Sequence, residues 1–357
     1  MDLKVFNDIS KLKKDTWEKY FDNDNLFVNY NFLTQFSKYH KNFEHLFIVN
    51  GKNRFYGNIF NVKLQGLKNY SKNFIFRFIL GLFDFNFFYL TNSQITNASS
   101  FDIKENFSLE KIISKVTNEK KINFVVIPDY LFQNSKNNFY LQDYVKVEIE
   151  EDMKLTISSK WNDFNSYKSD LKTKYRKKIN TIFKNSNSLK IRVLTRSDLS
   201  TYKSEMQNLF NDVIKTNKFQ GPKFNVEFFQ SIISDFDSFN VYGYFLDNQM
   251  VAFSSEFLNN ENLYSYFVGI NYNLNKKHSI YERILCEAIN NAIKNKNKNV
   301  IFGRTANEFK SNFGAVPKRS YVYFKAQNKF VAILLKEFLK NIKPKSWTQR
   351  NPFKESI

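Results

Sequence analysis

The chain has 357 residues, of which 42% are hydrophobic and 25% charged, a composition typical of a folded protein of about two domains. A single cysteine, Cys286, excludes a disulfide framework and a multi-cysteine zinc site. With only three histidines (His40, His45, His278), the sequence also argues against a histidine-rich metal site. Residues 1–14 lack the apolar core of a signal peptide, so we expect a cytoplasmic protein.

The net charge of +20 is distributed unevenly. Residues 1–150 carry 20 basic and 16 acidic side chains, whereas residues 151–357 carry 34 and 18. A/T-rich coding, which favours Lys, Asn, Phe, Ile and Tyr, would spread a basic excess evenly. We therefore expect a polyanionic partner on the C-terminal half. Nucleic acid, anionic lipid, a phosphorylated cofactor and an acidic carrier protein all fit.

Residues 71–90 are the most apolar stretch. Arg77 and Asp84 interrupt it, so it is too short for a membrane span. A buried strand pair is the favoured interpretation, and a lipid-contacting surface is the alternative.

Helix and strand patterns alternate in the first half. The expected elements are a helix over 33–43, two strands over 45–64, a helix over 105–121 and a strand over 122–131. Asn50-Gly51 indicates a hairpin turn because both residues tolerate positive φ. Ser108 is the expected N-cap of the second helix, and Pro128 should end the strand.

The second half repeats this order. Its expected elements are a basic helix over 166–185, a strand over 189–195, a helix over 199–215, three strands over 239–270, a helix over 280–296 and a strand over 299–305. Turns are expected at Asp247-Asn248 and Asn259-Asn260. Residues 47–60 and 244–257 both read as strand, Asx turn, strand, which indicates either a duplicated α/β domain or coincidence.

A short charged linker is predicted near 149–160. At the C-terminus, an amphipathic helix ends at Pro344, with Trp347 beyond it. Its apolar side is formed by Phe330, Leu334, Leu335, Phe338 and Ile342. Such a helix either packs on its domain, which we favour, or lies in a membrane interface.

Familiar catalytic motifs are missing: the sequence has no Gly-x-Ser-x-Gly, no phosphate-binding Gly-x-x-x-x-Gly-Lys-Ser/Thr, no Cys-x-x-Cys and no His-Glu-x-x-His. Cys286 falls on the predicted core side of its helix, so we interpret it as a structural thiol. No bound metal is predicted.

Residues 263–325 read as strand, helix, strand and loop. The last strand and loop contain Gly303, Arg304, Thr305, Lys310 and Gly314. This order resembles the GNAT superfamily and, more narrowly, the FemAB-like, double-GNAT group of bacterial acyltransferases. The resemblance covers residues 150–325 by pattern and 1–150 by architecture.

The resemblance implies an α/β fold with mixed sheets, built as two tandem GNAT-like domains with a C-terminal amphipathic helix. The corresponding ranges are a degenerate, supporting domain over 1–150, a catalytic domain over 151–327, and the helix and tail over 328–357. Arg304 and Thr305 would bind the acyl donor, as would Lys174 and Arg176 on a basic helix similar to one in the family.

One departure concerns the donor. Simple acetyltransferases hold the coenzyme A pyrophosphate on a Gly-rich turn, whereas residues 273–283 here contain no glycine. The following helix N-terminus still offers N–H groups, and Lys276 and Lys277 add positive charge. Acyl-coenzyme A, an acidic acyl-carrier protein and an aminoacyl-tRNA therefore all remain candidate donors.

Acyl transfer to an amine requires orientation, a base and oxyanion stabilisation. We expect Glu256 to be the base, with a pKa raised by apolar neighbours; a solvated strand-end carboxylate is the alternative. Lys310 and Arg304 could bind phosphate or polarise the carbonyl, or be plain surface cations. Tyr266 and His278 are weaker candidates for the acceptor pocket or a proton relay.

The leading hypothesis is a GNAT-type N-acyltransferase that uses an acyl thioester and acts on an amine, with a lipid amine at the inner membrane face as a favoured acceptor. One alternative is FemAB-like aminoacyl transfer from tRNA to a peptidoglycan precursor. Another is a non-catalytic binder of nucleic acid or anionic membrane built on the same scaffold.

Overall fold

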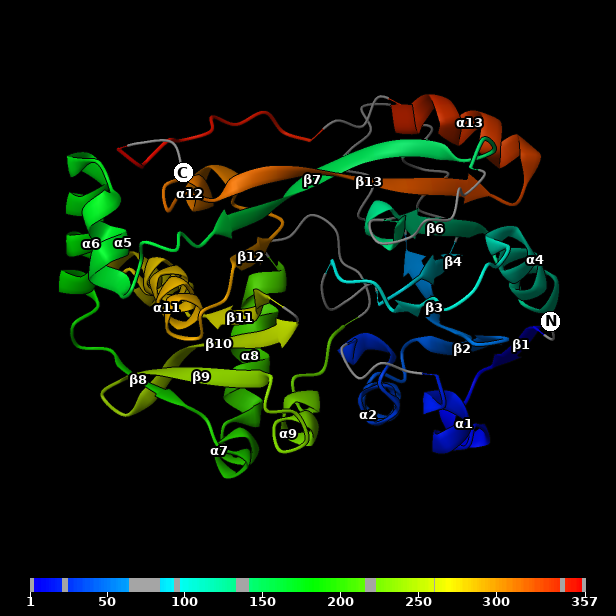
Figure 1. Cartoon of the computed structure of the whole chain (residues 1–357), viewed down its shortest axis with the longest axis horizontal. Coiled ribbons are helices and arrows are strands. Elements are labelled where there is room, and N and C mark those ends of the chain that lie inside the picture. The colour runs from blue at the N-terminus through cyan, green and yellow to red at the C-terminus, as the bar shows by residue number, and fades with distance from the viewer. Residues whose placement is uncertain are drawn as a thin grey trace. The chain divides into compact units, whose positions relative to one another are not determined.

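The computed structural model describes residues 3–20, 25–63, 84–92, 97–132, 141–215, 223–259, 261–340 and 344–354 (Figure 1). They form two compact units, neither of which is one continuous stretch. The first contains Met1–Ile149, Lys218–Asn225 and Ser320–Pro344, and the second contains Glu150–Asn217, Val226–Arg319 and Lys345–Ile357. The chain passes from one unit to the other within strands β7 and β13.

The first unit is built on a mixed sheet in the order β1-β2-β3-β4-β6-β13, with β5 paired to β3. Its strands are β1 (Leu3–Phe6), β2 (Glu44–Asn50), β3 (Asn53–Lys63), β4 (Asp84–Leu90), β5 (Phe101–Asp102), β6 (Phe124–Pro128) and β13 (Val316–Ala326). Its helices are α1 (Lys14–Glu18), α2 (Tyr30–Tyr39), α4 (Leu109–Glu119) and α13 (Lys329–Lys340). Short 3-10 turns lie at Ile9–Lys11, Leu26–Val28 and Asp129–Phe132.

Local sequence signals set these elements. The Ser108 side chain caps α4, as predicted, and Pro128 is the last residue of β6. The predicted β2–β3 hairpin is confirmed, but its turn is one residue later than expected. Asn50 still pairs with Asn53, so Gly51, with a φ of 58°, is the first turn residue.

The second unit has the sheet order β7-β12-β11-β10-β9-β8. Its strands are β7 (Val145–Thr156), β8 (Lys190–Val193), β9 (Phe239–Leu246), β10 (Gln249–Asn259), β11 (Asn262–Ile270) and β12 (Asn299–Gly303). Its helices are α5 (Phe164–Asp170), α6 (Thr173–Asn185), α7 (Arg196–Thr201), α8 (Lys203–Lys215), α9 (Phe228–Ile232), α10 (Tyr272–His278), α11 (Ile280–Lys294) and α12 (Asn307–Ser311).

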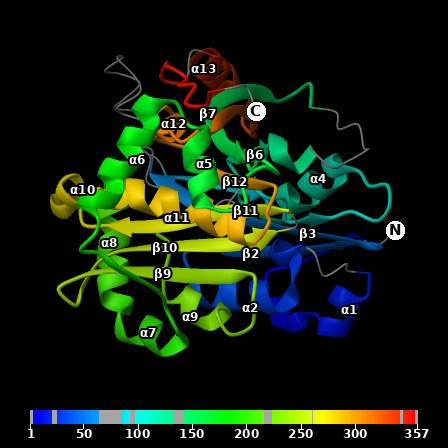
Figure 2. The same cartoon turned by 60° about the vertical axis from the view of Figure 1, so that its left-hand side comes forward.

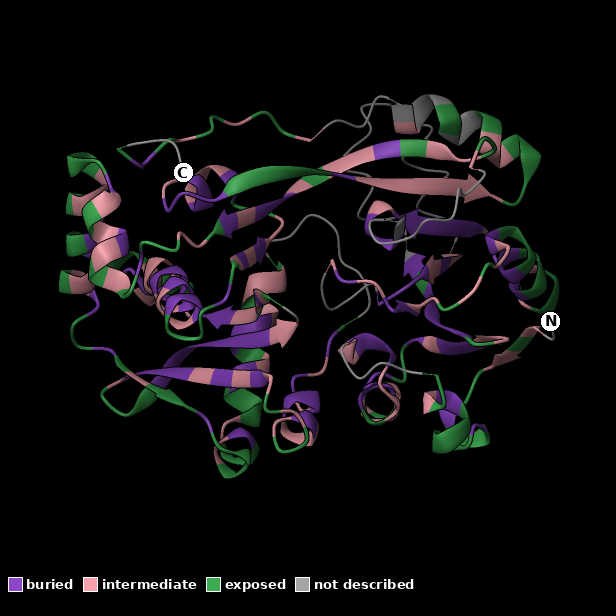
Figure 3. Ribbon diagram, in the orientation of Figure 1, coloured by how far each residue is buried: buried purple, intermediate pink, exposed green. Residues whose placement is uncertain are grey.

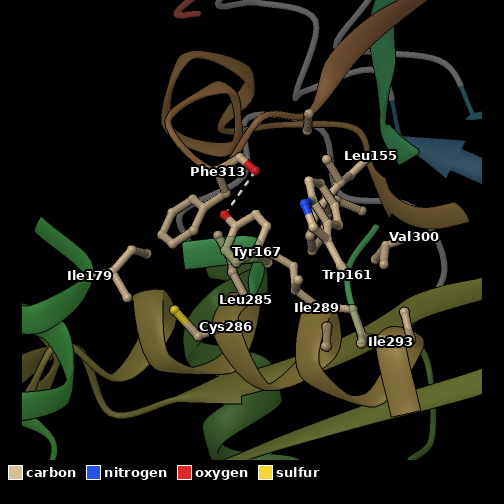
Figure 4. Packing of buried hydrophobic residues seen from close by; sticks show 14 of the residues in the cluster. Leu155, Trp161, Tyr167, Ile179, Leu285, Cys286, Ile289, Ile293, Val300 and Phe313 are labelled. Atoms are coloured by element: carbon tan, nitrogen blue, oxygen red, sulfur yellow. Dashed lines mark hydrogen bonds between the residues drawn. The ribbon is translucent and has the colours of Figure 1, made fainter. Parts of the chain in front are cut away.

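Helices cover both faces of this sheet. The long helix α11 lies across one face of β10 to β12 (Figure 2), and its Leu285, Cys286, Ile289 and Ile293 side chains contribute to the buried core shown in Figure 4. Helix α8 covers the opposite face, where the Phe210 ring meets that of Phe267 on β11. Cys286 is fully buried and burial raises its thiol pKa, consistent with the predicted structural thiol. The α/β fold with mixed sheets is confirmed.

Several sequence expectations differ from the structure. The predicted linker near 149–160 is mostly strand, because residues 145–156 form β7. The predicted single basic helix over 166–185 is two helices, interrupted at Leu171, which forms a β-bridge with Phe353. Of the apolar stretch 71–90, residues 71–83 lie outside the described residues and 84–90 form β4.

The amphipathic C-terminal helix is present as α13, although it starts at Lys329 and is described only to Lys340. Phe330 and Ile333 are 80% and 68% exposed. Ile342 and the side chains of Leu334, Leu335 and Phe338 lie outside the described residues. No helix in the described part of the chain is long and apolar enough to cross a bilayer.

The C-terminal segment is bound tightly to the second unit. Pro352 O accepts from the Lys172 N–H at 2.8 Å, and the Lys354 N–H donates to Asp170 O at 3.0 Å. Between these bonds, Phe353 packs on Trp161 with a ring separation of 5.5 Å. A Cβ at Gly314, whose φ is 91°, would lie 2.2 Å from the Phe353 ring.

Gly314→Ala should therefore destabilise the protein more than Gly303→Ala. Both positions have positive φ, which costs an alanine about 1–2 kcal/mol, but a Cβ at Gly303 meets no atom within 4 Å. Displacing Phe353 should add roughly 1–3 kcal/mol at Gly314. Urea unfolding measures both variants, and equal losses would contradict this packing.

Candidate functional site

Strands β11 and β12 are parallel neighbours that separate. They pair at three positions, ending with Tyr264 opposite Ile301. Beyond that point β11 continues to Ile270 and β12 to Gly303 without further pairing between them. We call residues 265–270 and 302–306 the strand divergence. Backbone polar groups there cannot use the neighbouring strand and need other partners.

A β-bulge lies at the start of the divergence. The β10–β11 register shifts between Ser254 and Glu256, so Ser255 faces two residues, Tyr266 and Phe267. The Ser255 hydroxyl accepts the Phe267 N–H at 3.0 Å and can donate to Phe267 O at 3.3 Å. Its side chain thus holds the bulge where β11 leaves β12.

Lys310 fixes the other side of the divergence. It is only 3% exposed, and its Nζ donates to the carbonyls of Phe302, Gly303 and Arg304 at 2.8, 3.1 and 2.8 Å. Burial lowers the pKa of Lys310 to about 7, while the negative charges of Asp152 and Glu150 oppose that shift. The sequence alternative of a plain surface cation is wrong for Lys310.

The turn that Lys310 holds has an unusual backbone. Gly303, Thr305 and Ala306 have φ values of 72°, 67° and 51°. Positive φ is unfavourable for alanine and more so for a β-branched threonine. Strained backbone of this kind persists where surrounding contacts enforce it, and it is enriched at functional sites.

Glu256 lies on β10 beneath helix α11. It is 4% exposed, and its Oε2 accepts the Asn291 amide at 3.0 Å, with Tyr242 as a further hydrogen-bond partner. Burial, and then the charge of Glu287, raise its pKa to about 7. The expected raised pKa is therefore confirmed, and the alternative of a solvated strand-end carboxylate is wrong.

The neighbouring carboxylate is neutralised. Arg283 Nε donates to Glu287 Oε1 at 2.6 Å, and Arg283 also donates to the Ser186 hydroxyl at 3.0 Å. In the described part of the chain, the hydrogen-bond partners of Glu256 are Asn291 and Tyr242, and neither carries a positive charge. Of these two carboxylates, Glu256 is the one suited to accept a proton near neutral pH.

The predicted phosphate-binding loop differs from expectation. Residues 272–278 form helix α10, which leads directly into α11 through Ser279. The Asn275 side chain accepts the Tyr281 N–H at 2.8 Å, so an N–H of the first turn of α11 is already used. Lys276 and Lys277 are exposed in the last turn of α10.

These two lysines lie near a second basic element, because α10 contacts α6. Helix α6 has no acidic residue, and most of its residues are exposed or half-buried (Figure 3). Lys174 is exposed on this helix and Arg176 is partly exposed. The structure thus places the two helices that carry these predicted donor-binding residues in contact with each other. It places Arg304 and Thr305 in the turn after β12 instead.

The structure gives less detail on the remaining predicted residues, Tyr266, His278, Arg304 and Thr305, whose roles stay predictions. The Tyr266 side chain lies outside the described residues, although its backbone forms part of the bulge. His278 is buried, and neither ring nitrogen has a hydrogen-bond partner among the described residues. The same holds for Nε and Nη2 of Arg304, whereas Thr305 is exposed.

Ser255 was not singled out from the sequence. The available signal was two adjacent serines, Ser254 and Ser255, that follow an apolar run in the strand. One of them must face each side of the sheet, but only the register shift shows which of them meets the bulge.

A bulged strand that separates from its parallel neighbour, with α11 on one face and α8 on the other, defines a GNAT-type transferase fold. Residues 98–356 match the FemAB-like family, described as peptidoglycan biosynthesis/recognition. The match covers more than half of the chain, so this chain belongs to the FemAB-like family, as the sequence resemblance indicated.

Solved structures share the fold at low sequence identity. A conserved protein of unknown function from Bacteroides thetaiotaomicron VPI-5482 matches 91% of this chain and 100% of its own, with a TM-score of 0.54 and 10% identity. L-PGS from Bacillus licheniformis matches 92% of this chain and 97% of its own, with a TM-score of 0.50 and 9% identity. No curated protein sequence matches the chain.

Glu256→Gln should change how stability depends on pH. The pKa of Glu256 rises from 4.5 to about 7 on folding, so the folded chain binds this proton more tightly and loses stability as pH rises through that window. Glutamine keeps the acceptor for Asn291 without a charge. The variant should match the parent at pH 4 and exceed it at pH 8 by about 1–3 kcal/mol in urea unfolding. Parallel pH profiles would contradict the shift.

Proposed function

We propose that this chain is an N-acyltransferase that moves an acyl group from an acyl thioester, carried by coenzyme A or an acyl-carrier protein, to an amine. The strand divergence carries the proposal. A bulge directs backbone groups away from the sheet ladder, and backbone N–H groups fixed in this way can stabilise the oxyanion that forms at the donor carbonyl.

In the proposed reaction the amine nitrogen attacks the donor carbonyl and forms the new C–N bond. The C–S bond breaks, the thiolate leaves, and a base takes the proton from nitrogen. Glu256 is the proposed base, because its carboxylate is largely desolvated and its pKa lies near neutrality. Glu256→Gln should then abolish most turnover while the fold remains intact.

The donor's phosphates, or the acidic surface of a carrier protein, are proposed to bind the basic surface formed by α6 and α10. Lys174, Arg176, Lys276 and Lys277 provide its charge. The bond between Asn275 and Tyr281 argues for binding through these side chains rather than through a Gly-rich turn.

The second candidate is aminoacyl transfer from tRNA to a peptidoglycan precursor. The family match favours it, and so does a basic surface that extends over two helices. The same divergence would then bind an ester carbonyl instead of a thioester. Binding of tRNA should weaken steeply as salt is raised, since it releases counterions.

Thermal unfolding with coenzyme A, palmitoyl-coenzyme A, an acyl-carrier-protein thioester and tRNA separates these candidates. A bound donor at about 100 times its dissociation constant adds roughly 2.7 kcal/mol of stability. We expect palmitoyl-coenzyme A to stabilise the protein and Lys276→Gln/Lys277→Gln to weaken that effect.

Lys111→Gln/Lys115→Gln on α4 is the matched control, since it removes two exposed lysines elsewhere. Stabilisation by tRNA alone would replace the thioester proposal with the aminoacyl one. No stabilisation by any donor would contradict both and favour a non-catalytic scaffold.

We further propose a lipid amine as acceptor and peripheral binding to an anionic membrane through α13. Phe330 and Ile333 project from this helix into solvent, and Lys329 and Lys336 are exposed beside them. Between Lys318 and Lys345 the sequence has eight basic residues and one acidic residue. Exposed apolar side chains on a basic helix are typical of interfacial binding.

Phe330→Ser/Ile333→Ser should lower binding to vesicles that contain phosphatidylglycerol by about tenfold or more, because two apolar side chains no longer insert. Sedimentation with these vesicles and with pure phosphatidylcholine measures the effect. Val193→Ser removes an exposed apolar residue of the other unit and should bind normally. Equal binding by all three proteins would exclude α13 as the membrane contact.

A further inference from the structure

The two sides of the strand divergence are each held by one buried side chain. On the β11 side, the Ser255 hydroxyl accepts the Phe267 N–H and can donate to the Phe267 carbonyl. On the β12 side, Lys310 gathers three consecutive carbonyls. Both contacts lie at the point where sheet hydrogen bonding between β11 and β12 has ended.

The bonding capacity of Lys310 is filled. An ammonium group has three N–H donors and no acceptor. All three are accounted for by the carbonyls of Phe302, Gly303 and Arg304, at 2.8–3.1 Å. A substrate phosphate or oxyanion could bind Lys310 only by displacing one of these carbonyls, which would then lose its hydrogen bond to the lysine.

The turn itself needs such a clamp. Three of the four residues Gly303–Ala306 have positive φ, and without an enforcing contact a non-glycine residue leaves that region readily. Lys310 enforces the turn from its inner side because its charge can be buried there only while the carbonyls face it.

Ser255 fixes the backbone of the bulge on β11. An extra residue in a strand leaves one position out of the ladder, and its direction is then set by local contacts. The hydroxyl fixes Phe267 through both its N–H and its carbonyl, so the preceding peptide, at Tyr266, is fixed as well. The hydroxyl of Ser254, its neighbour, instead approaches the Tyr244 hydroxyl at 3.3 Å.

The geometry points to Ser255 and Lys310 as paired positioning residues of the transfer site. They fix the backbone of Tyr266–Phe267 and of Gly303–Ala306 on the two sides of the donor carbonyl, and neither side chain contacts the substrate. The link to the donor carbonyl rests on the proposed function, whereas the two backbone restraints do not.

Amide hydrogen exchange in the ligand-free protein tests the restraints directly. Ser255→Ala should speed exchange over residues 265–269 by about tenfold, because each lost hydrogen bond favours local opening. Ser255→Thr, which keeps the hydroxyl, should restore the parent rate. Ser254→Ala removes a buried hydroxyl from the same strand and should leave residues 265–269 unchanged.

Lys310→Met keeps the apolar stem and should speed exchange over residues 303–307 with little effect on 265–269. Thermal unfolding shows whether each variant is folded. If Lys310→Met does not fold, the Ser255→Ala and Ser255→Thr variants alone test the inference. Unchanged exchange in Ser255→Ala would overturn it, as would failure of Ser255→Thr to restore the parent rate.

Kinetics separates this inference from the proposed chemistry. Transfer can be measured from palmitoyl-coenzyme A to sphinganine, a lipid amine of the class proposed as acceptor. In this reaction Ser255→Ala should lower kcat by about tenfold with KM nearly unchanged, since only transition-state positioning is lost. If the variants exchange faster but the parent protein does not transfer the acyl group, the two backbone restraints stand and the proposed reaction is contradicted. A rise in KM alone would show that Ser255 acts on binding and overturn its positioning role.

Discussion

The central constraint in this molecule is that β11 and β12 begin as paired parallel strands and then stop pairing. Beyond Tyr264 and Ile301, the backbone groups of each strand that point toward the other lose their expected partner there, and a buried group without a partner is costly. The serine at the bulge and the lysine at the strained turn meet that demand. Helices α8 and α11 pack on the sheet around this point, where β10 and β11 remain paired.

Buried ionisable groups follow from the same constraint. Lys310 remains among carbonyls, where its positive charge has partners, and Glu256 lies under α11 with an amide and a hydroxyl but no cation. Burial lowers the pKa of the lysine and raises that of the glutamate, so both lie near neutrality. A group that exchanges its proton near neutral pH is useful in amine acylation, and the glutamate is the one whose capacity is not filled by backbone.

Much of the fold could be predicted because local signals agree with it. Ser108, Pro128 and the Asp247-Asn248 turn, whose φ values are both positive, define element ends within a few residues. The prediction of a linker near 149–160 was wrong because these residues are mostly part of β7. That strand carries charged side chains on one side and buried side chains on the other, and its charged residues make the sequence resemble a polar connection. The family could be recognised from the sequence through Gly303, Lys310 and Gly314. The carbonyls that accept hydrogen bonds from Lys310 could not be predicted, because they depend on a turn whose left-handed conformation at Thr305 and Ala306 follows from no residue propensity.

We propose that the strand divergence polarises the carbonyl of the bound donor. A ketone analogue of palmitoyl-coenzyme A, with a methylene group between sulfur and a ¹³C-labelled carbonyl, binds without reacting and reports this directly. Hydrogen bonds from backbone N–H groups should move the carbonyl resonance downfield on binding, and the movement should shrink in Ser255→Ala. A bound analogue whose carbonyl resonates as it does in free solution would contradict the account.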